Sequence, residues 1–355
     1  MGGATAPHTA GRIPHMTKPR AVLITGANGE IGHGLIDALR AESPHLKLLA
    51  LDLQPPSKEL GEKCDASIVG NILDQTLIGR LCQDFELQTI FHLAALLSTS
   101  GERKPGLAHQ VNVEGTINLL NLAEAAGKRQ GYPVVFLFPS SIAVYGLPNR
   151  SIREHAPPVT EDQFTSPITM YGCNKLYCEH LGRYYSKHYM QLDQPEDSIR
   201  VDFRSIRFPG LISATTKPSG GTSDYGPEMI HEAAQGLPYR CFVSEDTALP
   251  FMAMPDAIRA ILLLQNAKRS SLSTSVYNIS AFNPTALDFA ERTRRAFPGA
   301  DIRFEPDIHR QRLVHSWPRS IDDSRARADW GFAPQFDFDR AFDDYLVPHI
   351  RNRYR

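Results

Sequence analysis

Short apolar runs alternate with stretches of helical spacing along the first two thirds of the chain. The run at 21–25 reads Ala-Val-Leu-Ile-Thr, which is typical of a parallel strand that is buried on both faces. Further strands are predicted at 46–53, 89–93, 133–138 and 201–208, and helices at 31–40, 112–127 and 171–189. Strands that alternate with helices predict an α/β fold, a Rossmann-type doubly wound parallel sheet.

The pattern changes after residue 208. Residues 209–227 include four glycines and three prolines, which predicts a long loop region. Helical spacing then returns at 228–235, 255–266 and 284–296. We therefore expect a sheet domain over 19–208 and a smaller, partly interleaved domain over 209–355, with some segments that return to the sheet. The second domain is expected to cover the carboxyl ends of the strands, where open α/β sheets bind ligands.

Composition and charge exclude several classes of protein. The 355 residues include 38 Lys and Arg against 39 Asp and Glu, so the chain has no basic surface for nucleic acid or an anionic membrane. The apolar run at 134–138 is far shorter than the roughly 18 residues of a membrane span. A cytoplasmic protein, or one of the mitochondrial matrix in a eukaryote, is expected. Residues 1–18 are expected to be an added leader or a disordered tail.

Cysteine and histidine spacing argues against a metal site. The five cysteines are scattered without a CxxC pair, and the thirteen histidines include no HExxH sequence. Structural zinc, zinc-protease chemistry and a disulfide framework are therefore not expected. His92 follows a predicted strand, and we interpret it as a structural residue.

A glycine-rich turn joins the first predicted strand to the first predicted helix. Gly26, Gly29 and Gly32 have a GxxGxxG spacing, which suits a tight turn, close approach to a pyrophosphate and close helix–strand packing. The following helix would direct its N-terminal N–H groups at the phosphates. Asp52 ends the second strand, where a carboxylate can bind the adenosine ribose hydroxyls and repel a 2′-phosphate. This combination favours NAD over NADP.

A second group of polar residues indicates proton-transfer chemistry. Tyr171 and Lys175 are four apart and share one helix face. A free tyrosine has a pKa of about 10, but a lysine cation and an oxidised nicotinamide both favour the phenolate. Ser141 follows the predicted strand at the same rim of the sheet, and Asn112 begins an intervening helix. The four residues in this order after a dinucleotide turn form a specific constellation.

These motifs resemble the extended short-chain dehydrogenase/reductase superfamily, which is related to the nucleotide-sugar epimerases. The matching segments are TGANGEIG at 25–32, HLAA at 92–95, NVEGT at 112–116, SSIAVYG at 140–146 and YGCNK at 171–175. Within the superfamily, later segments are similar to the short-chain L-threonine 3-dehydrogenases. Those segments are FPGLIS at 208–213, SGGTSDYGPEM at 219–229, EDTALPFMAMPDA at 245–257 and SWPRSIDDSRARADWG at 316–331.

The resemblance implies NAD-dependent oxidation of the β-hydroxyl of L-threonine to 2-amino-3-oxobutyrate. It makes Tyr171 the general base, while Lys175 lowers its pKa and binds the nicotinamide ribose. It also makes Ser141 hold the reacting oxygen and Asn112 support a proton relay. The cofactor-binding positions that it implies are Gly26, Gly29, Glu30, Ile31, Gly32, Asp52, Leu53, Asn71, Ile72, Leu93, Ala94, Ala95, Ser140, Tyr171, Lys175 and Leu211. The substrate positions are Ser98, Ser141, Tyr171, Gly221, Thr222 and Trp317.

Two alternatives remain open at this stage. One is a nucleotide-sugar epimerase or dehydratase that uses NAD without net turnover, and the other is an NAD-binding redox sensor. Pro209 occupies the region where epimerases carry an Asn that grips the diphosphate, which favours a smaller substrate. A sensor would not need the Ser141, Tyr171 and Lys175 set, because binding alone requires no base. The amphipathic helices at 112–127 and 171–189 suggest a homodimer.

Overall fold

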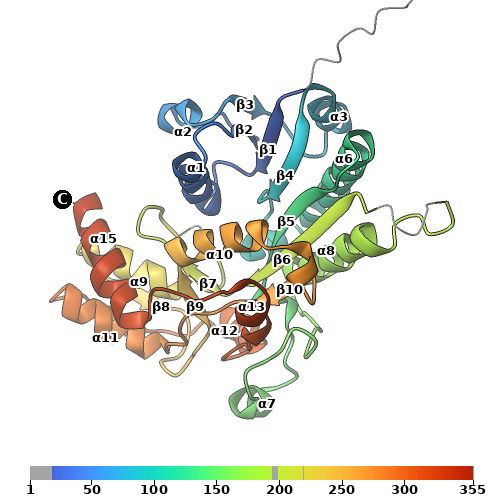
Figure 1. Ribbon diagram of the computed structural model, residues 1–355. Coiled ribbons are helices and arrows are strands. Elements are labelled where there is room, and N and C mark those ends of the chain that lie inside the picture. Colours follow the sequence, from blue (N-terminus) through green and yellow to red (C-terminus); the bar gives the residue numbers. More distant parts are fainter. Residues whose placement is uncertain (1–17, 194–198, 219, 355) are drawn as a thin grey trace, which may run out of the picture.

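A seven-stranded parallel sheet forms the centre of the computed structural model (Figure 1). The structure describes residues 18–193, 199–218 and 220–354. The strand order is β10-β6-β5-β4-β1-β2-β3, so the order reverses between β1 and β4 as in doubly wound sheets. The strands are β1 (Arg20–Thr25), β2 (Lys47–Asp52), β3 (Ala66–Val69), β4 (Glu86–His92), β5 (Val134–Ser141), β6 (Val201–Phe208) and β10 (Val276–Asn278).

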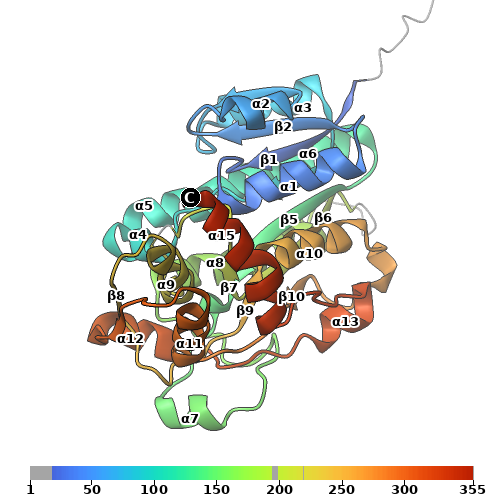
Figure 2. The ribbon, with the colours of Figure 1, turned by 90° about the vertical axis from the view of Figure 1, so that its left-hand side faces the viewer.

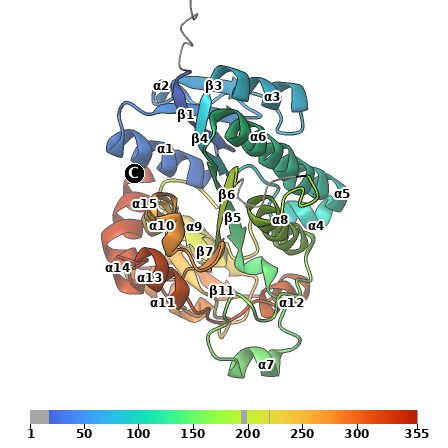
Figure 3. The same cartoon turned by 45° about the vertical axis from the view of Figure 1, so that its right-hand side comes forward.

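The run of apolar residues in β1 is continuous because both faces of the strand are buried. Val22 and Ile24 belong to the core that includes α1 (Glu30–Glu42) and α10 (Met254–Asn266). Ala21 and Leu23 face the opposite core, under α3 (Gln75–Asp84), α6 (Gly115–Gln130) and α8 (Met170–Lys187). Figure 3 shows the two helical layers on either side of the sheet. Because successive side chains point to opposite faces, a strand covered on both sides is apolar throughout. The predicted fold is confirmed.

One predicted helix boundary is wrong. The helix expected over 112–127 begins with a π-helical turn, Gln110–Glu114, and continues as α6 to Gln130. It ends at Gly131, whose φ of 78° is the left-handed conformation that favours glycine. Gly127, the last residue of the predicted helix, instead lies inside α6 and allows close packing, since a Cβ there would overlap the Arg200 carbonyl oxygen.

A second lobe lies below the carboxyl ends of the sheet strands (Figure 2). It contains two pairs of short parallel strands, β7 (Gly210–Ile212) with β9 (Phe251–Ala253) and β8 (Tyr239–Cys241) with β11 (Ile302–Phe304). Its helices are α9 (Tyr225–Ala234), α11 (Ala286–Ala296), α12 (Ile308–His315), α13 (Ser324–Trp330), α14 (Phe338–Arg340) and α15 (Val347–Arg353), with a π-helical turn at Ala341–Leu346.

The two parts of the chain interleave. β10 pairs with β6 in the main sheet, and α10 packs beside α1. The division at residues 208 and 209 into two domains stays a prediction. Shorter helices complete the fold: α2 (Lys58–Glu62), α4 (Ser98–Arg103), α5 (Pro105–His109) and α7 (Arg150–His155), with 3-10 turns at Ile142–Val144 and Arg269–Ser271.

The predicted leader, residues 1–18, lies outside the described residues apart from Lys18. Among the described segments, no helix has the length and apolar content that crossing a membrane requires. Cys64, Cys173, Cys178 and Cys241 are free thiols.

Candidate active site

A cleft of about 910 Å³ opens at the carboxyl ends of the central strands. Every predicted cofactor and substrate residue lines it, and Asn112 does not. The second lobe closes one side with residues 216–217 and 221–224, and Trp317 lies in the wall. The cleft lies where the strand order reverses, and open α/β sheets bind their ligands at this point.

The glycine turn is shaped for close approach of a ligand and of neighbouring backbone. Gly26 has a φ of 69°, and a Cβ there would lie 2.6 Å from the Ala94 nitrogen. A Cβ on Gly32 would overlap the Ala27 carbonyl oxygen, so a side chain at either position would push α1 away from the sheet. The first turn of α1 is thereby held at the cleft with its N-terminal N–H groups available to an anion.

Asp52 is fixed at the end of β2. One carboxylate oxygen accepts from the Asn28 backbone N–H at 3.0 Å, and the other accepts from Gln54 N–H at 3.3 Å. Two further acceptor positions on the carboxylate remain available to paired hydroxyls. A phosphate placed here would be repelled by the carboxylate charge. Asn71 and Ile72 follow β3 at the same end of the cleft, and Ile72 is buried.

Tyr171 and Ser141 come together because α8 packs directly on the turn that follows β5. Thr169 caps α8 by accepting from the Gly172 N–H at 3.0 Å. A Cβ on Gly172 would overlap the Ala143 carbonyl oxygen, so only glycine allows this approach. The Ser141 hydroxyl then forms a hydrogen bond with the Tyr171 phenol. Burial raises the pKa of Tyr171 to about 12, and the Ser141 bond acts to lower it.

Lys175 lies one turn further along α8. Its Nζ donates to the Pro139 carbonyl oxygen at 2.6 Å and stands 4.5 Å from the centre of the Phe138 ring. Burial lowers the pKa of Lys175 to about 8, while nearby Cys178 and Glu179 act to raise it. The lowering of the Tyr171 pKa by Lys175 stays a prediction. In this arrangement Ser141 acts to lower the pKa of Tyr171, and the lysine ammonium is directed to a β5 carbonyl.

Asn112 supports the wall of the cleft from behind. Its side chain accepts from the Leu96 N–H at 2.7 Å and donates to the Leu96 carbonyl at 3.0 Å. Its own carbonyl accepts from the Thr116 hydroxyl at 2.6 Å and the Cys178 thiol at 3.2 Å. Asn112 therefore fixes the loop after β4, and the structure does not bring it together with Ser141 and Tyr171 in the cleft.

His92 is held as a neutral residue. Thr116 donates to the Asn112 carbonyl, so its oxygen accepts from His92 Nε2–H at 2.9 Å. His92 Nδ1 then accepts from the Thr25 hydroxyl at 2.9 Å. Burial, and secondarily the Lys175 charge, lower the pKa of His92 to about 3. Its geometry is that of a structural residue, since both ring nitrogens are occupied.

The expected substrate residues meet where the loop of the second lobe lies against α4. The Thr222 hydroxyl donates to Ser98 Oγ at 3.0 Å, and both side chains are buried. Gly221 N–H donates to the Asp224 carboxylate at 2.6 Å. The Gly221 N–H is therefore already bonded within the loop.

Trp317 is 4% exposed and lines the same cleft. Its indole Nε1–H has no acceptor among the described residues. A buried N–H without a partner costs free energy, and this one is closed off from the open space of the cleft.

Comparison with known proteins agrees with this geometry. Residues 22–280 match the model of the NAD dependent epimerase/dehydratase family. The chain belongs to this family. It is 34% identical to a mitochondrial L-threonine 3-dehydrogenase of Bos taurus over 316 residues, which are 89% of this chain and 79% of the relative. It is 35% identical to an uncharacterized epimerase/dehydratase of Staphylococcus aureus over 319 residues, which are 90% and 93% of the two chains.

A solved structure of a monomeric L-threonine 3-dehydrogenase from a metagenome database superposes with a TM-score of 0.81 at 35% identity, over 94% of this chain and 100% of that one. The resemblance to the extended short-chain dehydrogenases of the threonine type is thus confirmed, and the chain is an NAD-dependent oxidoreductase of this family. The residues present fit NAD: Gly26 has no room for a Cβ, α1 begins at the cleft, and Asp52 presents a fixed carboxylate.

Sequence reasoning missed one buried ion pair close to Lys175, between Glu179 and Arg207. Glu179, four residues after Lys175, accepts from Arg207 at 2.6 and 2.9 Å in a two-point contact. It also accepts from the Ser140 hydroxyl at 2.5 Å, so the hydroxyl expected to serve the cofactor is bonded to Glu179. The i, i+4 spacing of Glu179 from Lys175 is a signal that could have placed it on the same helix face.

Proposed function

We propose that this protein oxidises the β-hydroxyl of L-threonine with NAD+, giving 2-amino-3-oxobutyrate, NADH and a proton. The observation that carries the proposal is one cleft that is lined both by the Ser141 and Tyr171 pair and by the buried Ser98 and Thr222 pair. The first pair suits a reacting hydroxyl and the second a small polar substrate. The similarity to L-threonine 3-dehydrogenases supports the same substrate.

Tyr171 acts as the general base in this proposal. Its phenolate takes the proton of the substrate β-hydroxyl, while Ser141 donates a hydrogen bond to the reacting oxygen. The pKa of Tyr171 is raised to about 12 by burial, so the phenolate needs positive charge nearby. NAD+ bound in the cleft would supply the hydride acceptor for the substrate Cβ and the positive charge of its nicotinamide ring. Positioned proton transfer of this kind contributes about 10² to 10⁴ in rate.

Lys175 binds the nicotinamide ribose and adds positive charge beside Tyr171. Its ammonium is 5.5 Å from the centre of the Tyr171 ring, and its bond to Pro139 holds it there. Asn112 supports the reaction indirectly, through the loop at Leu96 and its contacts with Cys178 on α8. The remaining cofactor contacts are assigned to the glycine turn, Asp52 with Leu53, Asn71 with Ile72, the 93–95 loop, Ser140 and Leu211.

The amino and carboxyl groups of threonine need partners once water leaves the site. Ser98 and Thr222 offer hydroxyls, and Trp317 forms part of the wall of the same cleft. Gly221 contributes to the shape of the pocket, because its N–H is bonded to Asp224.

NADH formation by purified protein with NAD+ and L-threonine tests the proposal. D-threonine, L-serine and NADP+ are the controls. Activity that needs L-threonine and NAD+, and that is lost in Tyr171→Phe, supports both the substrate and the base. No turnover with any amino acid contradicts the proposed substrate, and UDP-sugars then test the epimerase alternative. NAD binding without any turnover would favour the redox-sensor alternative.

We also propose a homodimer formed through α8 and its neighbours. Tyr177 and Tyr184, which are two turns apart on α8, are 50% and 41% exposed, and this side of the helix supports a contact with a second copy of the chain. Sedimentation that shows only monomer at micromolar concentration would contradict the proposed dimer. One solved relative is described as monomeric. A cytoplasmic or mitochondrial-matrix location and a part in threonine breakdown complete the proposal.

A further inference from the structure

The end of β5 presents polar groups to α8. Phe136 and Phe138 belong to the core under α8, and because successive residues of a strand alternate, Ser140 points to the same face of the sheet. Arg207 lies across from Ser140 in the pairing of β5 with β6, so its side chain points to that face as well. A hydroxyl and a cation on neighbouring strands thus meet one helix.

Glu179 on α8 accepts hydrogen bonds from both of these residues. The Ser140 hydroxyl donates to Oε1 at 2.5 Å, while Arg207 donates to Oε1 from Nε at 2.9 Å and to Oε2 from Nη2 at 2.6 Å. The side chains of Glu179 and Arg207 are 3% and 5% exposed. A two-point contact between guanidinium and carboxylate fixes the geometry of both groups, so a negative charge is held at a defined point on α8.

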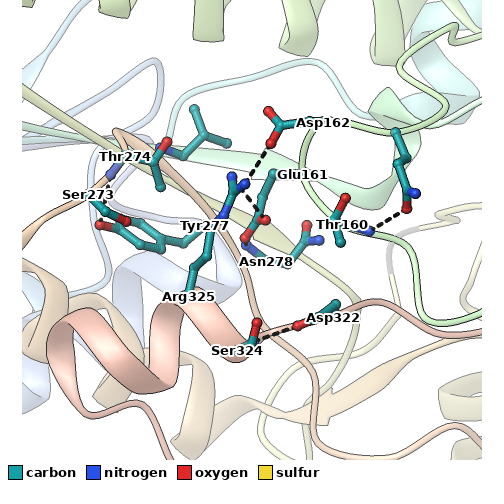
Figure 4. A network of polar contacts seen from close by, with 12 residues as sticks. Thr160, Glu161, Asp162, Ser273, Thr274, Tyr277, Asn278, Asp322, Ser324 and Arg325 are labelled. Carbon is teal, nitrogen blue, oxygen red and sulfur yellow. Dashed lines mark hydrogen bonds and ion pairs between the residues drawn. The ribbon is translucent and has the colours of Figure 1, made fainter.

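The guanidinium of Arg207 is also held from its other side. Its Nη1 donates to the Tyr145 hydroxyl at 3.0 Å and to the Glu161 carbonyl at 2.7 Å. The Glu161 carboxylate accepts from the Asn278 N–H at 3.0 Å and lies 3.5 Å from Arg325 on α13 (Figure 4). These contacts tie the cation to β10 and α13, so the ion pair on α8 is part of a fixed polar network.

Lys175 lies one turn before Glu179 on the same face of α8, and it is buried as well. Burial lowers the pKa of Lys175 to about 8, while nearby Cys178 and Glu179 act to raise it. Burial also raises the pKa of the Cys178 thiol to about 11. The thiol is therefore uncharged at neutral pH, and the carboxylate is the charged group of the two.

The other titratable groups around Lys175 leave this effect in place. His92 on β4 has a pKa of about 3 and is neutral, and the Tyr171 phenol has a pKa of about 12 and is protonated. Arg207 is a cation, but its guanidinium is bonded to Glu179. Opposite charge nearby favours an ammonium, whereas an unpaired arginine would disfavour it.

We propose that Glu179 is a positioning residue for the reaction, whose carboxylate keeps Lys175 in its ammonium form. The inference rests on the proposed function, in which the Lys175 ammonium binds the nicotinamide ribose and favours the Tyr171 phenolate. Two observations carry it: a buried carboxylate that an arginine and a serine hold in place, and a buried lysine one helical turn away in the cleft wall.

The titration of Lys175 in the ligand-free protein tests the proposal directly. Labelling of lysine with ¹³C at Cε gives a resonance that moves as the ammonium loses its proton, and Lys175→Met assigns the signal. For the wild type we expect a midpoint near the pKa of about 8. In Glu179→Gln the midpoint should be lower by about one pH unit or more.

Glu124→Gln is the matched control. Glu124 on α6 also pairs with an arginine, Arg200, and both side chains are largely buried. Arg200 directly precedes β6, whereas Arg207 lies near the other end of that strand. This substitution removes the same charge from the same kind of pair at a distance from Lys175, and it should leave the Lys175 midpoint unchanged.

A double variant separates the charge of Glu179 from the stability of the pair. Glu179→Gln leaves the buried Arg207 without a carboxylate, which is destabilising. Glu179→Met combined with Arg207→Met removes both charges, and such apolar replacements often keep the stability of the fold. The melting temperature of the double variant should return towards the wild-type value, while the Lys175 midpoint should stay low.

Steady-state kinetics extend the test to the reaction. The kcat for L-threonine should fall at alkaline pH as Lys175 loses its proton, and in Glu179→Gln this fall should move to lower pH with the midpoint. A shift of one pH unit would lower kcat about fivefold at pH 8, because about half of the lysines are charged at the pKa and about a tenth one unit above it. Glu124→Gln should keep the wild-type profile.

An unchanged Lys175 midpoint in folded Glu179→Gln would overturn the proposal. A wild-type midpoint in the double variant would overturn it too, since the unpaired Arg207 would then have caused the shift. A lowered midpoint with an unmoved kcat profile would show that the charge does not serve the reaction. If the wild-type protein oxidises no amino acid, the proposed function fails, and the ligand-free titration still decides whether Glu179 keeps Lys175 charged.

Discussion

Gly172 lies against the carbonyl oxygen of Ala143, with no room between them for a single methyl group. This contact sets the distance between α8, which carries Tyr171, and the end of β5, which carries Ser141. The hydrogen bond between phenol and hydroxyl depends on it.

Gly172→Ala should therefore reduce activity strongly. An added Cβ would push α8 from the turn at 142–144, and misplacement by about 1 Å costs about 10² in rate. Gly79→Ala in α3 is the matched control, since a Cβ there meets nothing within 4 Å; it should leave kcat unchanged and add about 0.5–1 kcal/mol of stability. Equal kcat values for the two variants would contradict the role of the contact.

Ser141→Ala should raise the pKa of Tyr171 further. The Ser141 hydrogen bond opposes the effect of burial, so its removal should move the rise of activity with pH to higher pH. At neutral pH we expect kcat to fall by about 10² or more, as when one donor to a reacting oxygen is lost. Ser141→Thr keeps a hydroxyl and should retain the wild-type pH profile. A profile unshifted in Ser141→Ala would mean that this hydroxyl does not set the Tyr171 pKa.

His92 should make the fold sensitive to acid. Its pKa is near 3 in the folded protein against 6.5 when unfolded, so below pH 6.5 the unfolded chain takes up the proton first. Stability is therefore lost as the pH falls from 6.5 towards 3, by up to about 1.4 kcal/mol per pH unit. Urea unfolding at pH 7 and 5 should show a larger loss for wild type than for His92→Gln, by about 2 kcal/mol. Equal losses would contradict the assignment.

Ser98 and Thr222 should act as a unit in substrate binding. Each hydroxyl is bonded to the other, so Ser98→Ala and Thr222→Ala should each raise the KM for L-threonine about fivefold, and the double variant by little more. The KM for NAD+ serves as the internal control. A Thr222→Ala protein with wild-type efficiency for threonine would remove this loop from the substrate site.

The sequence predicted an element or a site residue correctly where the pattern lies within a single helix, strand or turn. The apolar run of β1, the glycines at 26–32 and the Tyr171 to Lys175 spacing each depend on neighbours in sequence. The structure buries β1 in the sheet and places the glycines, Tyr171 and Lys175 in one cleft. Strands of three residues, such as β7 and β9, are too short to show a period. The edge strand β3 is partly exposed and only four residues long.

Contacts between distant segments could not be read from spacing. Asn112 is bonded to Leu96 rather than facing the cleft, because the loop after β4 folds back over its helix. The Gly221 N–H is taken by a carboxylate that a turn brings to it. Arg153 donates to the carbonyl of Trp317, which lies 164 residues away, and neither residue carries a motif that would indicate the other.

The return of β10 to the main sheet has a consequence for how the protein can be made. β6 is buried along its whole length. The edge of β6 that does not pair with β5 is covered by β10, residues 276–278, and α10 packs on one face of the strand. A ribosome that has released the first 208 residues has therefore produced a sheet with an unprotected, apolar border. A gene fragment that stops there should yield aggregates rather than a cofactor-binding module, and folding should complete only after residue 278 has emerged.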